Sequence, residues 1–297
     1  VAGVNAGNSI VSGGNYNTLV GDEAGTAITT GEYNTASGKS ALAANTTGSS
    51  NTAVGFAALD ANTTASNNTG VGFEALSANT TASYNTAVGY HSLKANTTAI
   101  RNSAFGSVAL TTNTTGAENT AVGYASMNGN TTGSDNTAIG RSSLQNNTTG
   151  GNNVAVGRNA LTQSTTASNN TAVGYYSLLA NTTGASNTAI GYQASNDNTT
   201  GTQNVSVGYQ AFTNGTTGSY CTAIGVSALQ AIVTGDNNVA VGRKAMYDNT
   251  SGADNTAVGN AALFANTTGA NNAAVGFEAL KSNTTGYNNS AFGYQNM

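Results

Sequence analysis

The chain has 297 residues, with 38 glycines, one cysteine, one histidine, no proline, no tryptophan and a net charge of −4 at pH 7. One cysteine argues against a disulfide framework or a cysteine-rich zinc site, and one histidine argues against a catalytic triad. Eight basic residues give no electrostatic footprint for nucleic acid, and no apolar run reaches the about 18 residues of a membrane span.

A glycine recurs every 17 residues from Gly21 to Gly293. The copy Asn51–Asn67 (NTAVGFAALDANTTASN) serves as the reference, and its positions are numbered p1 to p17. The p5 residue is Gly in all 17 copies, and p1 is Asn in all except Cys221. Charged residues occur only at p6, p7, p10, p11, p16 and p17. A disordered tract has no reason to separate charge in this way, so the repeat predicts a folded chain.

The start of the chain differs from the repeats. Residues 1–16 fit the 17-residue pattern poorly and are expected to form an N-terminal cap or lead-in. Residues 17–297 are predicted to form a solenoid of sixteen 17-residue repeats plus a partial last coil. Val1 stands in place of an initiator methionine, and the last copy stops at p9 with Met297. The hypothesis from these ends is a processed piece or the ordered part of a longer chain.

Within each copy, the short β-prone run p2–p4 predicts a strand, and the p5 glycine predicts a turn at positive φ. A second strand or extended stretch is expected at p6–p9, and the Asn-Thr-Thr-Gly segment at p12–p15 predicts a second corner. Helical repeats need about 33 residues, which excludes them here. The fold class is therefore all-β, a parallel β-solenoid or β-roll. The predicted structural turn includes Gly55, Gly72, Gly89, Gly123, Gly140 and Gly157.

In such a coil each residue stacks on its equivalent about 4.8 Å away. Stacked asparagines at p1 and p12 predict amide ladders, which include Asn51, Asn68 and Asn85 at p1 and Asn62, Asn79 and Asn96 at p12. Twelve Asn-x-Thr/Ser triplets begin at p12, starting with Asn45, and they match glycosylation acceptors. A structural ladder explains the same spacing without glycans.

Side chains alternate along p2–p4, so Val and Ala lie on opposite faces of the strand. Counting the p4 Val or Ile and the p9 Leu as the core leaves the p3 alanines as a second, outer packing surface. We therefore predict self-association, most simply as a homotrimer with the alanine columns near its axis.

The p6 column carries aromatic and arginine side chains and is a candidate surface for binding sugars or another protein. The alternative is cross-coil stacking that stabilises the sheet. The column includes Phe56, Phe73, Tyr90, Tyr124, Arg141, Arg158, Tyr175, Tyr192, Tyr209, Arg243, Phe277 and Tyr294.

The remaining candidates are isolated. His91 lies at p7 and is expected to be a surface substitution. Cys221 is expected to be a tolerated defect of the p1 ladder, with a reactive thiol as the alternative. The Thr pairs at p13–p14, beginning with Thr46 and Thr47, raise the alternative of an ice-matching array. No catalytic constellation, metal site or cofactor site emerges, so we expect no enzyme.

Two runs, NTAVGYHSLKANTT (Asn85–Thr98) and NTAIGYQAS (Asn187–Ser195), resemble the head repeats of trimeric autotransporter adhesins and the shafts of phage tail fibres. The resemblance covers essentially residues 17–297, although the adhesin repeat is commonly shorter. It implies a left-handed parallel β-roll in a homotrimer.

The expected function is a structural fibre, first a phage tail-fibre-like trimeric rod for host attachment. The alternatives are the head of a bacterial trimeric surface adhesin and, from another class, an ice-binding β-solenoid. The expected partners are copies of the chain itself and a host-surface glycan or protein, without nucleic acid or membrane insertion. The expected location is extracellular or on a virion surface.

Overall fold

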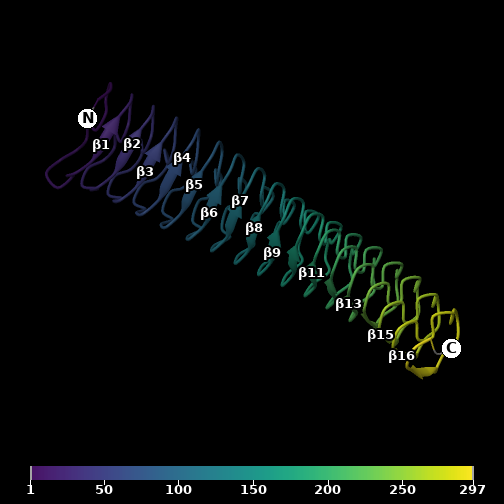
Figure 1. Cartoon of the computed structure of the whole chain (residues 1–297). Coiled ribbons are helices and arrows are strands. Elements are labelled where there is room, and N and C mark those ends of the chain that lie inside the picture. Colours follow the sequence, from purple (N-terminus) through teal and green to yellow (C-terminus); the bar gives the residue numbers. More distant parts are fainter. Residues whose placement is uncertain (1, 296–297) are drawn as a thin grey trace. The chain divides into compact units, whose positions relative to one another are not determined.

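The computed structural model describes residues 2–295, which contain strands and turns but no helix. Two compact units divide the chain, Val1–Gly151 and Asn152–Met297. Within each unit the chain winds in successive coils, each lying on the one before it (Figure 1). The fold is the all-β parallel β-solenoid of 17-residue coils that the repeat predicts. The expectations about the chain ends rest on Val1 and Met297, which lie outside the described residues.

Each copy contributes one three-residue strand at p2–p4. The first unit contains β1 (Thr18–Val20), β2 (Thr35–Ser37), β3 (Thr52–Val54), β4 (Thr69–Val71), β5 (Thr86–Val88), β6 (Ser103–Phe105), β7 (Thr120–Val122) and β8 (Thr137–Ile139). The second contains β9 (Val154–Val156), β10 (Thr171–Val173), β11 (Thr188–Ile190), β12 (Val205–Val207), β13 (Thr222–Ile224), β14 (Val239–Val241), β15 (Thr256–Val258), β16 (Ala273–Val275) and β17 (Ser290–Phe292).

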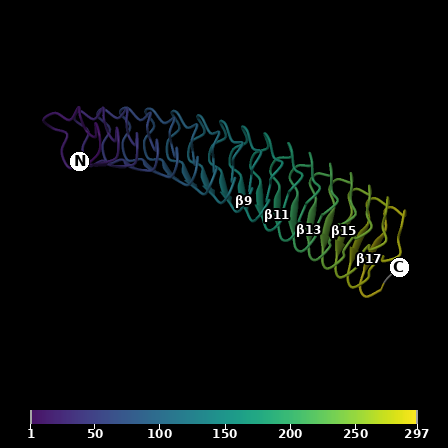
Figure 2. The ribbon, with the colours of Figure 1, turned by 90° about the horizontal axis from the view of Figure 1, so that it is seen from above.

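Consecutive strands of a unit pair in parallel, and each residue pairs with its equivalent in the next coil. Thr52 pairs with Thr69 and Val54 with Val71, for example. In the second unit, β9 to β17 lie side by side along one side of the coils (Figure 2). Outside the strands, Leu59 N–H donates to the Ala75 carbonyl at 3.0 Å in the next coil. An inserted residue would misalign all of these bonds, which accounts for the constant period.

The expected second strand at p6–p9 is wrong. Residues 56–61 form turns, and Ala57 and Leu59 have φ of 50° and 53°. The p7 and p9 residues of most other coils share this left-handed conformation. Such a conformation costs a non-glycine residue roughly 1–2 kcal/mol, and the backbone bonds between coils offset that cost.

The p5 glycine is required by both conformation and space. Gly89 has φ of 141°, and a Cβ at this position would lie 2.4 Å from the Gly106 carbonyl oxygen. The other five predicted turn glycines have φ between 130° and 137°. A side chain would therefore meet strain and a clash with the next coil.

The predicted face of the strand is reversed. Ala53 at p3 is fully buried, whereas Val54 at p4 is 38% exposed. The reason is the narrow coil: Ser92, at p8 on the opposite wall, donates from Oγ to the Ala104 carbonyl at 3.0 Å. From β2 onward only Ala, Gly or Ser stands at p3 between these walls, so small side chains form this part of the core, whereas the first coil has the fully buried Leu19 at p3 beside Gly25 at p9. The alanines cannot be the outer packing surface.

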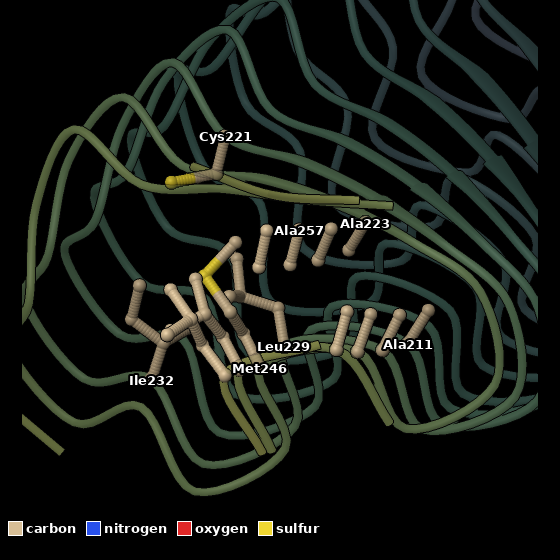
Figure 3. Close-up of a cluster of buried hydrophobic side chains, with 14 of the residues drawn as sticks. Ala211, Cys221, Ala223, Leu229, Ile232, Met246 and Ala257 are labelled. Carbon is tan, nitrogen blue, oxygen red and sulfur yellow. The ribbon is translucent and has the colours of Figure 1, made fainter. Parts of the chain in front are cut away.

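The second unit shows the same core in a close-up (Figure 3). Ala223 and Ala257 point into the coil from the strands, and Ala211 points inward from the p8 wall. Leu229 and Met246, both at p9, fill the space beside them and are fully buried. The large core side chain of most coils is therefore the one at p9.

The expected lead-in follows the path of a coil. Ala2 forms a parallel bridge with Val20, and Gly3, Asn5 and Gly7 have φ of 132°, 57° and 61°, the pattern of p5, p7 and p9. Val11 N–H donates to Thr29 O as a p13 residue does. The segment Ser12–Gly14 then has one residue more than the corresponding segment of later coils, which explains the poor match in sequence.

Candidate functional site

The p1 asparagines connect each coil to its neighbours through the backbone. Asn68 N–H donates to Asn51 Oδ1 at 3.0 Å, and Asn68 Nδ2 donates to the Ala82 carbonyl at 2.9 Å. Asn85 N–H repeats the first contact on Asn68 Oδ1 at 2.9 Å. These side chains are fully buried. Each one therefore satisfies a backbone donor and a backbone acceptor that lie inside the coil.

The p12 asparagines form a second ladder, from side chain to side chain. Asn79 Nδ2 donates to Asn62 Oδ1 at 3.0 Å, and Asn96 Nδ2 donates to Asn79 Oδ1 at 3.0 Å. Asn79 Nδ2 also donates to the Ala82 carbonyl at 2.9 Å, the acceptor that Asn68 uses. The two ladders thus meet at the p15 carbonyl and hold the p12–p15 corner.

The p6 column is divided into runs. In the first unit Phe56, Phe73 and Tyr90 stack with ring centroids 5.0 and 5.6 Å apart. In the second unit the spacings of the Tyr175–Tyr192–Tyr209 run are 5.5 and 5.2 Å, and that of the Phe277–Tyr294 pair is 5.1 Å.

The arginines of the column either extend these runs or stand apart from them. Arg141 lies 5.9 Å from the Tyr124 ring centroid, and Arg158 lies 5.7 Å from that of Tyr175. The p6 residues next to Arg243 in its column are Val226 and Asn260, so no aromatic ring adjoins it there.

Stacking follows from the coil and is not special to p6. Tyr16 and Tyr33 at p17 stack at 5.1 Å, and Tyr247 and Phe264 at p10 stack at 5.2 Å. The inner rings of a run therefore have both faces covered by neighbours, and they present their edges and hydroxyls. This geometry favours the stabilising interpretation of the p6 column over sugar stacking on a ring face.

Four ionisable side chains gather in the first unit. Glu74 Oε2 lies 3.1 Å from His91 Nε2 and 2.5 Å from Lys94 Nζ. The hydrogen bond from Lys94 and the charges of Lys94 and His91 lower the pKa of Glu74. Burial raises the pKa of Asp60, and the nearby Glu74 charge adds to this effect. Asp60, Glu74 and Lys94 border a surface depression of about 330 Å³. His91 is thus part of an ion-pair cluster in a surface column.

Cys221 takes the place of a p1 asparagine inside the second unit. Its thiol is 1% exposed and donates to the Gly235 carbonyl at 3.3 Å, the bond that an asparagine Nδ2 makes in other coils. Burial raises the pKa of Cys221 to about 11. A thiol that stays protonated and buried is a poor nucleophile, which favours the ladder-defect interpretation.

The Thr pair at p13–p14 is not a uniform array. Thr63 Oγ1 donates to the Thr80 carbonyl at 3.1 Å, so the p13 hydroxyl is used between coils. Thr64 at p14 is exposed, and both residues lie in a bend rather than in a flat strand.

The outer face of the strands is the surface that sequence reasoning missed. It consists of the p2 and p4 side chains, mainly Thr and Val or Ile, and no copy places a charged residue in either column. Val54, Phe105 and Ile139 are 38%, 41% and 41% exposed. The absence of charge from p2 and p4 was the signal for this surface. It was not recognised because p4 was expected to lie in the core.

Within residues 2–295, no three His, Cys, Asp or Glu side chains cluster as a metal site, and no helix could cross a membrane. Comparisons with family models, with curated proteins and with solved structures found no match to this chain.

Proposed function

We propose that this chain is a structural shaft, and not an enzyme, whose coils associate with copies of the same chain. The observation that carries the proposal is the outer strand face of p2 and p4. Soluble monomers rarely expose contiguous apolar patches above a few hundred Å². An uncharged Thr and Val surface repeated in every coil of a unit is therefore a candidate interface.

A second copy of the chain matches this face in period as well as in chemistry. Sheets that pack face to face lie about 10 Å apart, with spacing between strands set by the backbone. Two copies share that spacing, so every coil of one can oppose a coil of the other. The resemblance to trimeric adhesin heads and phage tail-fibre shafts supports a homotrimer with the p4 columns at its axis, in place of the alanines.

Charge on the outer face tests the interface. The double variant Val54→Glu and Ile139→Glu places carboxylates on p4 of β3 and β8. We expect mass photometry to find a trimer for the unmodified chain and a monomer for this variant, with unchanged circular dichroism. Ser50→Glu and Asn67→Glu, at the exposed p17 corner, form the matched control and leave the trimer intact. A folded monomeric parent chain contradicts the proposal.

Host attachment is the biological role we propose for the shaft, on a virion surface in the manner of a tail fibre. The p6 edges and hydroxyls supply weak contacts that repetition along the coils would strengthen. A glycan array and binding to host cells test this role. The triple variant Tyr175→Phe, Tyr192→Phe and Tyr209→Phe keeps the stacked rings and removes the hydroxyls, and we expect it to bind more weakly.

The bacterial adhesin head remains the alternative within this class, and secretion genes beside the coding gene would favour it over the tail fibre. Ice binding remains the alternative from another class. The exposed p14 threonines are its candidate surface, and a thermal-hysteresis assay tests it directly.

A further inference from the structure

The p12 ladder is built from asparagines that lie in N-glycosylation triplets. Twelve of these asparagines start an Asn-x-Thr/Ser sequence, and eleven of them are at most 1% exposed. The eleven are Asn45, Asn62, Asn79, Asn96, Asn113, Asn130, Asn147, Asn181, Asn198, Asn249 and Asn266. The twelfth, Asn283, lies in the last coil and is half-buried.

The transfer reaction would consume a hydrogen that the ladder uses. A bond forms between the asparagine Nδ2 and C1 of the sugar, and the C1–O bond to the lipid diphosphate donor breaks. The diphosphate leaves with that electron pair, and Nδ2 gives one proton to a base of the transferase. In Asn79 both Nδ2 hydrogens are already donated, to Asn62 Oδ1 at 3.0 Å and to the Ala82 carbonyl at 2.9 Å.

The same double donation occurs in nine of the twelve, for example in Asn266, whose Nδ2 donates to Asn249 Oδ1 at 3.2 Å and to Gly269 O at 2.9 Å. A glycan would remove one of these bonds from a buried site. Leaving a buried acceptor without its donor costs about 1–3 kcal/mol. The sugar itself finds no space, because the neighbouring coils cover the amide completely.

A different set of triplets begins at p17 and is open to solvent. Asn67, Asn169 and Asn288 each precede a p1 asparagine and a p2 Thr or Ser, and each is exposed. Their φ values of 60°, 62° and 59° place them at a left-handed corner on the surface. A glycan on these residues would extend into solvent without entering the coil.

We propose that N-glycosylation and folding are mutually exclusive at the eleven buried p12 triplets. An unmodified p12 asparagine completes the ladder, and a glycosylated one prevents its coil from closing. Because secretory transferases act on chains that are still unfolded, this chain folds only where no such transferase meets it first. The inference stands independently of the proposed shaft function.

The test expresses the full chain in a bacterial cytosol and in the secretory pathway of a eukaryotic cell. The key variant changes the third residue of each p12 triplet, Thr to Ala eleven times and Ser251→Ala once, which removes the acceptor sequence and keeps every ladder asparagine. It also carries Ser206→Ala, because the buried p1 Asn204 begins an Asn-Val-Ser triplet of its own and Ala is the usual p3 residue. The twelve p14 side chains that it changes are exposed in the fold. The matched control is Asn67→Gln, Asn169→Gln and Asn288→Gln, which removes only exposed acceptors.

We expect the parent chain to be protease-resistant from the cytosol, and glycosylated at p12 and protease-sensitive from the secretory route. The third-residue variant should be resistant from both routes, and the p17 control should behave as the parent does. Peptide mass mapping locates the glycans. A protease-resistant chain with a glycan on a buried p12 asparagine would overturn the proposal. So would a resistant secreted parent that is unmodified at p12, or a third-residue variant that folds in the cytosol and stays sensitive after secretion.

Discussion

Regular coils of the first unit and a substituted stretch of the second fill the interior beside p9 and p12 with different side chains. In residues 51–101 each coil has Leu at p9 and Asn at p12. In residues 195–232 the usual Leu at p9 is replaced by Ser195 in one coil and by Phe212 in the next. The usual Asn at p12 is replaced by Gly215 in the coil of Phe212 and by Ile232 in the coil after it. The strands keep the same length and parallel register through both stretches.

The substituted stretch shows that p9 and p12 share one volume. Phe212 is 1% exposed, and a Cβ on Gly215 would lie 2.2 Å from its Cε1. The first coil makes the opposite exchange, with Gly25 at p9 and the fully buried Ile28 at p12. In these two coils a change in size at one position is matched at the other, whereas the coil after Phe212 buries both Leu229 at p9 and Ile232 at p12.

Polar partners are exchanged in the same way. Ser195 donates to Ser206 Oγ at 2.8 Å, so two hydroxyls satisfy each other where Leu and Ala normally pack. Asn198 Oδ1 has no partner, because the next p12 residue is Gly215. The amide ladder therefore stabilises the coil but is not required in every coil.

The largest expected effect concerns the p5 glycine, which both stretches keep. Gly89→Ala in a regular coil and Gly225→Ala in the substituted stretch should each lower the free energy of unfolding by about 4 kcal/mol. The loss comes from strain at positive φ and from a clash with the next coil. Urea unfolding followed by circular dichroism measures the loss.

The control for these glycines is Gly70→Ala at p3, where the adjacent coils have Ala53 and Ala87 and an added Cβ would meet no atom closer than 3.1 Å. We expect a much smaller loss for it. If Gly89→Ala is as mild as Gly70→Ala, the turn does not depend on glycine.

Replacing Gly215 by the usual p12 asparagine should lower the free energy of unfolding. Gly215→Asn restores the p12 amide but collides with Phe212, and we expect a loss of about 3 kcal/mol from overpacking. The double variant Phe212→Leu with Gly215→Asn should regain most of that stability. A double-mutant cycle measures the coupling, and additive effects would contradict a shared volume.

Removal of one ladder amide should cost more in a regular coil than at a ladder end. Asn79→Ala leaves Asn62 Oδ1 without its donor and Asn96 Nδ2 without its acceptor, a loss of about 3 kcal/mol. Asn198→Ala disturbs a neighbour on one side only, and we expect about 2 kcal/mol. Amide hydrogen exchange in the flanking coils provides a local readout. Equal losses would mean that the ladder does not couple neighbouring coils.

The smallest expected effect on stability comes from a surface charge, Glu74, rather than from the core of the regular coils. Lys94 and His91 lower the pKa of Glu74, so its ionised form stabilises the fold above the usual pKa of 4.5, and this contribution disappears as pH falls through the lowered value. Glu74→Gln should cost about 0.5 kcal/mol at pH 7 and nothing at a pH below that lowered value.

The control for Glu74 is Glu118→Gln, whose carboxylate pairs with the exposed Arg101 at 2.9 Å. We expect a smaller loss from it at pH 7. A loss for Glu74→Gln that persists at low pH would place the role of Glu74 in packing rather than in charge.

The repeat, its p5 turn and its asparagine ladders could be predicted from the sequence. Fixed spacing predicts stacked equivalents, and invariant Gly with near-invariant Asn predicts the p5 turn and the ladders. The turns at p6–p9 were not predictable, because their left-handed residues are Leu59 and Ala57 rather than the Gly or Asn that usually mark such a conformation. The role of the p6 rings stayed open between stacking and binding, and no property of one residue decides between them.

The sequence by itself determined that the chain coils with a constant period, because parallel stacking tolerates no change in the number of residues per coil. It also determined where charge cannot lie. Only the tertiary structure decided which face of the strand is inside. Alternation gives two faces but not their order, and the closeness of the p3 and p8 walls admits Ala53 and excludes Val54. That decision moves the candidate interface from the alanines to the outer Thr and Val columns.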